Sequence, residues 1–234
     1  MPAPAAPKEP DPSETRVAAV KQVLDTKLAQ YGGTWSATYI DLESEKLVAA
    51  SLVKLYIMLA VFDGIEHGTI TDDANVDALL KQMITVSSNE AANGLLSRIG
   101  NGDGKAAIAT VTATAQRYGF TSSEELRTLT GMASGNAVEN WTSTRDCGSF
   151  LSQVYAGTLV SKNASERMMQ LLLGQTRRTK IPAGVPSGVK VANKTGELAA
   201  VQNDVAIVFG THPYVLAVMS SDISSAVAPS QITE

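Results

Sequence analysis

The chain has 234 residues, of which 44% are hydrophobic, and a formal net charge of −4 at pH 7. This length suffices for one sizeable core, or at most two lobes. The slightly negative charge, without a basic patch, argues against binding to nucleic acid. No apolar run reaches the length of a membrane span. A single cysteine, Cys147, excludes an intrachain disulfide, and with only His67 and His212 beside it there is little to form a zinc site. We therefore expect neither a metal nor a cofactor.

The N-terminal part predicts a tether, a helix and a strand in that order. Residues 1–12 are rich in proline and alanine without periodicity, as in a flexible tether. Residues 11–14 have the pattern of a helix start, residues 17–31 carry one apolar helical stripe, and residues 35–39 alternate as in a half-buried strand. The given sequence shows no charged-then-apolar signal peptide. Because a Pro/Ala tether before a folded domain suits an exported protein, we expect an exported bacterial protein (periplasmic, cell-surface or secreted) whose export signal is absent from this sequence.

The remainder predicts a helical block followed by three strands. The spacing of apolar residues predicts helices over four stretches: 86–99, 106–118, 144–155 and 165–173. An antiparallel meander is predicted by three β-rich runs with tight connections: 189–196, 204–209 and 214–220. We therefore expect an α/β (α+β) fold with an antiparallel sheet from both chain ends, flanked by helices. An all-helical lobe, about residues 65–185, would be inserted in this single domain of residues 13–234.

The most apolar stretch, residues 49–62, predicts a buried central helix. Its two polar side chains, Ser51 and Lys54, lie three residues apart and therefore share one helical face. They stand at the start of the run, where free backbone N–H groups and the helix dipole favour negative charge. A hydroxyl beside an amine at such a place suits a serine nucleophile with a lysine base. The alternative is that Ser51 caps the helix and Lys54 extends to water.

Two further motifs follow in the chain. Ser87-Ser88-Asn89 stands where a loop enters the helix of residues 90–99, and Lys194-Thr195-Gly196 lies on the first strand of the meander. Two of the patterns recur and are weak alone: Ser-x-x-Lys at 187–190, and Ser-x-Asn at 134–136 and 161–163. The order of all three motifs, on a helix start, a helix-entry loop and a strand, is far more specific.

Together these motifs resemble the class A serine β-lactamase and penicillin-binding D,D-transpeptidase superfamily. The likeness runs from about residue 49 to 222 and includes residues 87–96, residues 191–198 and Asn203-Asp204. It implies a serine hydrolase that opens the β-lactam amide through an acyl-enzyme on Ser51. The runner-up is a D,D-peptidase or penicillin-binding enzyme of peptidoglycan with slow β-lactam turnover. A non-catalytic binding domain is the third possibility.

The resemblance implies catalytic roles for four positions. Ser51 would attack the amide carbonyl, and Lys54, with its pKa lowered by burial and by neighbouring cations, would take the Ser51 proton. Ser87 would pass a proton to the departing nitrogen. The backbone N–H groups of Ser51 and Glu197 would hold the oxyanion.

The resemblance also implies how a substrate would bind. Asn89 would bind a substrate side-chain amide, while Lys194 and Thr195 would bind a carboxylate by charge and by hydroxyl. Gly196 would let the substrate lie against the strand. The expected partner is a small β-lactam or a peptidoglycan stem peptide, bound by a monomer with no metal, nucleic acid or membrane-spanning segment.

Class A β-lactamases also carry a glutamate, in the context Arg-x-Glu, that activates the water which removes the acyl group. This chain has Arg127-Thr128-Leu129 there, and a leucine cannot act as a base. Of two nearby acids, Glu125 and Glu139, we expect Glu139 to substitute, because it lies in the loop just before the helix start at 142–144. The alternative is that Glu139 is a solvated loop acid or a helix-end charge. Without such a base, acylation would be normal and hydrolysis slow.

Overall fold

The computed structural model describes residues 22, 46–129, 139–223 and 228–233. Nearly all of these residues belong to one compact unit, residues 45–234. The tether predicted for residues 1–12 and the strand predicted for 35–39 lie outside the described residues, as does almost all of the helix predicted between them. Most of the loop before residue 139 lies outside them as well.

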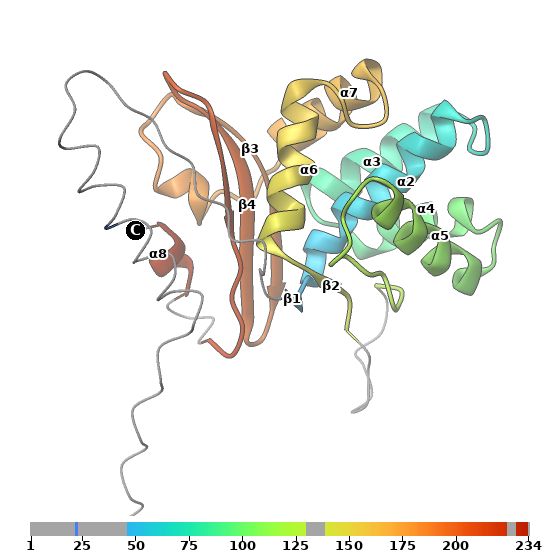
Figure 1. The fold of residues 1–234 in the computed structure, drawn as a ribbon, viewed down its shortest axis with the longest axis horizontal. Helices are drawn as coiled ribbons and strands as arrows, with labels where there is room; N and C mark the ends of the chain where they lie inside the picture. The colour runs from blue at the N-terminus through green and yellow to red at the C-terminus, as the bar shows by residue number, and fades with distance from the viewer. Residues whose placement is uncertain (1–21, 23–45, 130–138, 224–227, 234) are drawn as a thin grey trace, which may run out of the picture. The chain divides into compact units, whose positions relative to one another are not determined.

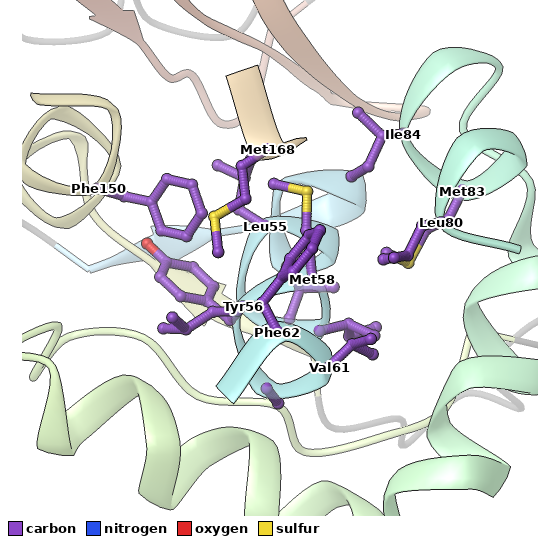
Figure 2. Packing of buried hydrophobic residues seen from close by; sticks show 14 of the residues in the cluster. Leu55, Tyr56, Met58, Val61, Phe62, Leu80, Met83, Ile84, Phe150 and Met168 are labelled. Atoms are coloured by element: carbon purple, nitrogen blue, oxygen red, sulfur yellow. The ribbon is translucent and has the colours of Figure 1, made fainter. Parts of the chain in front are cut away.

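A buried segment organises the helical part. A 3₁₀ turn, η1 (Ala50–Val53), runs directly into α2 (Lys54–Glu66), where the apolar run predicted one continuous helix. Because α2 is apolar on nearly every face, almost all of it is buried. Figure 2 shows α2 side chains packed among those of the surrounding helices: Leu55, Met58 and Phe62 with Leu80, Ile84, Phe150 and Met168.

Five more helices pack around α2 or beside one another: α3 (Ala74–Thr85), α4 (Asn89–Ile99), α5 (Gly104–Arg117), α6 (Thr144–Ala156) and α7 (Lys162–Leu173). Each is capped by an Asp or Ser side chain that accepts a hydrogen bond from a backbone N–H of the first turn. The helix predicted to begin at residue 86 begins at Asn89, because Ser88 caps it and Ser87 has a left-handed φ of 63°. Within the described residues, no helix is long and apolar enough to cross a membrane.

The predicted meander is present as a three-stranded antiparallel sheet: β3 (Lys190–Leu198), β4 (Val201–Phe209) and β5 (Tyr214–Val218). Helices α6 and α7 contact one side of this sheet (Figure 1). Successive residues of a strand face opposite sides, so Ala192 packs with the helical core while Val191 packs with Ile181 and Ile232.

These last two residues belong to a short turn, η2 (Ile181–Ala183), and to the C-terminal helix α8 (Ala228–Thr233), which lie on the other side of the sheet (Figure 1). A second, two-residue pairing joins β1 (Leu47–Val48) to β2 (Trp141–Thr142). The mixed helix and antiparallel-strand architecture confirms the predicted α/β class. The N-terminal strand expected to join the sheet falls outside the described residues.

Candidate active site

The turn that carries Ser51 is fixed by backbone contacts on several sides. The side-chain amide of Asn203 in β4 donates to the carbonyls of Val48 and Ala49 at 3.0 and 3.3 Å. The Ala49 N–H in turn donates to the Asn140 carbonyl at 2.8 Å. Ala50, which precedes Ser51, has a left-handed φ of 47°, a conformation that non-glycine residues adopt at a cost and that clusters at functional sites. Ser51 is therefore held in a tightly clamped turn at the start of α2.

Gly196 allows β3 to lie against this turn. A Cβ atom at position 196 would lie 2.7 Å from the Ala49 carbonyl oxygen and 3.2 Å from Leu52. Since real Cβ atoms do not approach a backbone oxygen that closely, any side chain at position 196 would push the turn away from the strand. The Lys-Thr-Gly motif thus also has a packing reason for its glycine, in addition to the substrate-binding reason expected from the sequence.

The Lys54 ammonium group lies at the centre of the site. Its Nζ is 3.0 Å from the Ser51 hydroxyl and 3.2 Å from the Ser87 hydroxyl. It also donates to the Ser87 carbonyl and to Asn89 Oδ1, both at 2.7 Å. Four acceptors therefore surround one fully buried nitrogen. The alternative in which Lys54 extends to water does not occur in this structure.

The Lys-Thr-Gly strand reaches the same place from the sheet. Lys194 Nζ donates to the Ser87 hydroxyl at 2.9 Å and to the Thr195 carbonyl at 2.6 Å. The Ser87 hydroxyl is thus within hydrogen-bond distance of both lysine nitrogens, one from α2 and one from β3. The structure therefore brings the three motifs together around Ser87, as their order in the chain predicted.

Burial and neighbouring cations lower the pKa of both lysines. Burial, followed by the Arg177 cation, lowers the pKa of Lys54 from 10.5 to about 8, and Glu125 and Glu90 oppose this change. Burial, followed by the cations of Lys54 and Arg177, lowers the pKa of Lys194 well below its ordinary value. Near pH 7, on the order of a tenth of Lys54 is therefore a neutral amine, which is the form that can accept a proton, and this fraction grows as pH rises.

Arg177 is a cation of the site that the sequence analysis did not single out. Its guanidinium donates to Glu197 Oε2 at 2.6 Å, and the buried Lys180 ammonium donates to Glu197 Oε1 at 2.8 Å. Burial alone would raise the pKa of Glu197, but the hydrogen bond from Lys180 and the two neighbouring cations hold it below its ordinary value. Glu197 and Thr195 lie on the same face of β3, so this ion cluster adjoins the position where a substrate carboxylate is expected.

Glu139, the predicted base, forms an ion pair in the loop. Its Oε2 accepts a hydrogen bond from Arg127 Nη2 at 2.8 Å. Among the described residues, no hydrogen bond joins Glu139 to Ser51 or Lys54. At Leu129, where the sequence resemblance led us to expect the family's glutamate, the backbone N–H donates to Asn93 Oδ1 at 3.0 Å.

Glu125, the other candidate acid, is buried to 1% exposure, and neither of its carboxyl oxygens has a hydrogen-bond partner among the residues that the structure describes. Burial raises its pKa from 4.5 to about 8, against the opposing effects of Arg127 and Lys54. Sequence spacing does not reveal this burial, because it depends on distant segments such as α5, where the Thr112 hydroxyl exchanges hydrogen bonds with the Glu125 backbone. The structure therefore distinguishes the two acids: Glu139 forms an ion pair, whereas Glu125 is buried and has no partner within the described part of the chain.

This fold, with three motifs meeting between a helical block and the Lys-Thr-Gly strand, defines a protein of the β-lactamase and penicillin-binding class. The sequence profile of the β-lactamase enzyme family matches residues 71–233, and the chain belongs to this family. The match begins after Ser51 and Lys54, so the assignment of these two residues rests on the geometry above. No curated protein sequence matches the chain significantly.

Solved structures share the fold. A β-lactamase from Sphaerobacter thermophilus DSM 20745 superposes with a TM-score of 0.70 at 22% identity, over 81% of this chain and 80% of that one. PBP-A gives a TM-score of 0.69 at 21% identity, over 81% and 78% of the two chains. An ancestral (GNCA) class A β-lactamase gives 0.68 at 20% identity, over 81% and 83%. Together with the family match, these structures confirm the predicted superfamily. Because the sequence identities are low, the structural similarity by itself shows only that the fold is shared.

Proposed function

We propose that the protein is a serine hydrolase that opens the β-lactam amide through an acyl-enzyme on Ser51, in the manner of a class A β-lactamase. Membership of the β-lactamase enzyme family supports this proposal. The observation that carries it is a chain of three contacts: Lys54 to Ser51 at 3.0 Å, Lys54 to Ser87 at 3.2 Å and Lys194 to Ser87 at 2.9 Å. These contacts connect a hydroxyl, an amine and a second hydroxyl in the order that proton transfer requires.

During acylation, protons move along this series of contacts from Ser51 through Lys54 to Ser87. The Ser51 oxygen forms a bond to the lactam carbonyl carbon while its proton passes to the neutral amine of Lys54. The tetrahedral intermediate then breaks its C–N bond. The departing nitrogen takes the Ser87 proton, and Lys54 returns a proton to Ser87. The backbone N–H groups of Ser51 and Glu197 hold the oxyanion, and one such donor contributes about 3 kcal/mol to transition-state stabilisation.

Substrate binding would use polar groups next to the Ser51, Lys54 and Ser87 contacts. The Asn89 carbonyl oxygen is bound to Lys54, so its amide nitrogen is the atom presented to an acylamino side chain. Lys194, with the Thr195 hydroxyl and the nearby Arg177 guanidinium, would attract the carboxylate of a β-lactam or of a stem peptide. This set of groups therefore suits a small anionic amide.

A D,D-peptidase or penicillin-binding enzyme of peptidoglycan is the second candidate. The observation that favours it is Leu129 at the position of the deacylating glutamate, together with the Arg127 ion pair that engages Glu139. An enzyme with these features would be acylated normally and would hydrolyse the adduct slowly. The two candidates share every residue of the acylation step and differ in the lifetime of the acyl-enzyme.

Intact-protein mass spectrometry after mixing with benzylpenicillin distinguishes these functions. We expect a mass increase equal to the whole penicillin, followed by release of penicilloate and return to the free mass. An adduct that persists for hours without product would select the D,D-peptidase function. Complete absence of an adduct, in protein shown to be folded by circular dichroism, would contradict both enzymes and leave a non-catalytic binding domain.

A further inference from the structure

The proposed acylation steps leave the buried ammonium of Lys180 unexplained. The residue is 1% exposed, and its Nζ donates to two acceptors, Glu197 Oε1 at 2.8 Å and the Asn203 carbonyl at 3.3 Å. A buried ion pair adds little net stability, because removing the ions from water costs about as much free energy as their attraction returns. Stability alone is therefore a weak reason for a cation at this place.

The segment that carries Lys180 is anchored to the sheet. The N–H of Ile181, the next residue, donates to Asp204 Oδ2 of β4 at 3.0 Å. Asp204 is itself held by the side-chain amide of Asn193 in β3, also at 3.0 Å. The Lys180 carbonyl accepts from the Ala183 N–H at 2.8 Å, at the start of η2. The Lys180 ammonium therefore extends from a fixed backbone toward β3 and β4.

The backbone N–H of Glu197 points away from β4. Glu197 lies opposite Gln202 in the register of the sheet. The N–H and the carbonyl of Gln202 both bond to the Ser220 hydroxyl, on the side of β4 where β5 lies, at 3.1 and 2.5 Å. Opposite residues of an antiparallel pair exchange both backbone hydrogen bonds or neither, so Glu197 and Gln202 exchange neither. In the described sheet β3 pairs with β4 alone, so the Glu197 N–H faces the free edge, as an oxyanion donor must.

No ladder bond orients this N–H, so its direction depends on the groups that hold Glu197. The strand β3 ends one residue later, at Leu198, and strand ends fray readily. The Glu197 side chain supplies an anchor, because Lys180 binds Oε1 at 2.8 Å and Arg177 binds Oε2 at 2.6 Å. The Arg177 side chain is 48% exposed, and an exposed ion pair constrains its partners weakly. Lys180 is therefore the firmer of the two anchors.

The same ammonium contacts the residue that clamps the nucleophile. The Asn203 side chain donates to the carbonyls of residues 48–49, just before the Ser51 turn. Lys180 binds the backbone carbonyl of this same asparagine. One buried cation is thus shared between the Glu197 side chain and the residue that holds the Ser51 turn. These are the two segments whose N–H groups would hold the oxyanion.

We propose that Lys180 is a positioning residue of the oxyanion hole, which fixes the Glu197 side chain so that the Glu197 N–H stays directed at the oxyanion on the Ser51 adduct. In this role, which rests on the proposed acyl-enzyme, Lys180 transfers no proton and touches no substrate. Its loss should slow the acylation step and leave substrate binding nearly unchanged, because the oxyanion develops only in the transition state. A purely structural ion pair would change stability and leave the rate of the folded enzyme unaltered.

The test uses two neutral probes, so that the charge lost with Lys180 does not itself change their binding. Benzylpenicillin methyl ester reports on acylation, and quenched-flow mass spectrometry gives both its dissociation constant and its maximal acylation rate. Phenylacetamidomethylboronic acid reports on the tetrahedral state. The Ser51 oxygen bonds to boron, the Ser51 proton passes to Lys54, and one oxygen of the resulting boronate takes the place of the oxyanion.

For Lys180→Met, we expect acylation about tenfold slower and the boronic acid bound about tenfold more weakly, less than the ~100-fold cost of removing a donor, because the N–H is misdirected and still present. The dissociation constant of the ester should stay within about threefold of wild type, since ground-state contacts are kept. Lys46→Met is the matched control, because it removes another lysine–glutamate pair, with Glu124 at 2.6 Å, away from the site. It should match wild type with both probes.

A double-mutant cycle shows whether Lys180 acts through Glu197. Glu197→Ala removes the anchor from the strand and keeps the backbone N–H, so it should slow acylation by the ester to a similar extent. Adding Lys180→Met to Glu197→Ala should then slow acylation by less than about threefold more, because both changes break the same contact. The double variant contains neither ion of the pair, so Glu197→Ala and the double variant carry the test if Lys180→Met alone fails to fold.

The remaining outcomes separate this role from others. Wild-type acylation and boronic acid affinity in folded Lys180→Met, or in Glu197→Ala, would overturn the inference while leaving the acyl-enzyme intact. Weaker ester binding at an unchanged acylation rate would overturn it too, as would additive losses in the cycle. A wild-type protein that neither the ester nor benzylpenicillin acylates would refute the proposed function, and this inference with it. Thermal unfolding of each variant shows whether a lost rate reflects a lost fold.

Discussion

The amine nitrogen of Lys54 lies 3.0 Å from the hydroxyl oxygen of Ser51. This distance allows direct proton transfer, but only to a neutral amine. Burial and the Arg177 cation supply that form by lowering the pKa of Lys54 to about 8. The contact identifies Ser51 as the nucleophile, and the lowered pKa of Lys54 sets the pH above which Ser51 becomes active.

The first prediction concerns the pH dependence of acylation. Below its pKa, Lys54 is an ammonium ion and cannot take the Ser51 proton, whereas above it the amine is free to do so. The second-order rate constant for acylation by benzylpenicillin should therefore rise from pH 6, reach half its plateau near pH 8 and level off above pH 9. A rate constant that is flat or falls over this range would argue against Lys54 as the base.

The second prediction removes the amine while keeping the length of the side chain. Lys54→Met should slow acylation by about 100-fold to 10,000-fold, the usual contribution of a general base. The variant leaves the Ser87 carbonyl and Asn89 Oδ1 without their common donor, so stability should be measured in parallel by thermal unfolding. Lys81→Met, at an exposed position of α3, is the control and should acylate like wild type. Equal rates for both variants would contradict the role of Lys54.

The third prediction concerns the ion cluster beside the carboxylate position. Glu197 neutralises Arg177 and Lys180 through contacts of 2.6 and 2.8 Å. Glu197→Gln would leave the exposed Arg177 guanidinium without its counter-ion, and the buried Lys180 would add to the positive field that an anionic substrate meets. We expect KM for benzylpenicillin to fall about fivefold, which corresponds to about 1 kcal/mol. The methyl ester of the same penicillin lacks the negative charge and should be unaffected. An equal change for acid and ester would show that Glu197 does not act through charge.

The fourth prediction tests how tightly β3 lies against the Ser51 turn. Gly196→Ala would place a Cβ atom 2.7 Å from the Ala49 carbonyl oxygen. We expect a loss of about 1–3 kcal/mol in the free energy of unfolding, typical of overpacking, together with slower acylation because the turn is displaced. Gly148→Ala in α6 has no atom within 4 Å of its new Cβ and should be stabilising by about 0.5–1 kcal/mol. Urea titration measures the free energy of unfolding of both variants. If Gly196→Ala were as stable as wild type, the turn that carries Ser51 would be able to move away from β3 without cost.

Much of this fold is encoded locally. In α4 the apolar residues that recur at helical spacing are the buried ones, because helical periodicity fixes which side chains share a face: Ala91, Ala92, Leu95 and Leu96. The three β-rich runs formed the expected meander since tight connections leave few other pairings. The second Ser-x-x-Lys pattern, residues 187–190, enters β3 from a turn and offers no helix start. Motif order and local context therefore favour the copy at residues 51–54, whose lysine lies beside Ser87 in the structure.

The parts that could not be predicted depend on contacts between distant segments. Strands β1 and β2 have two residues each, too few to show alternation, and exist because they pair with each other. Arg177 carries no motif, and its influence on Lys54 and Lys194 arises from the path of the chain before β3. Nothing in the spacing around Glu125 marks it as buried, because its environment is supplied by other elements.

Peptide mapping of the penicillin adduct tests the central claim most directly. The protein is labelled with benzylpenicillin, quenched in acid, digested and sequenced by tandem mass spectrometry, with Ser51→Ala treated in parallel. The account predicts one modified residue, Ser51, and no adduct in a folded Ser51→Ala variant. An adduct on any other side chain, or equal labelling of Ser51→Ala, would contradict it.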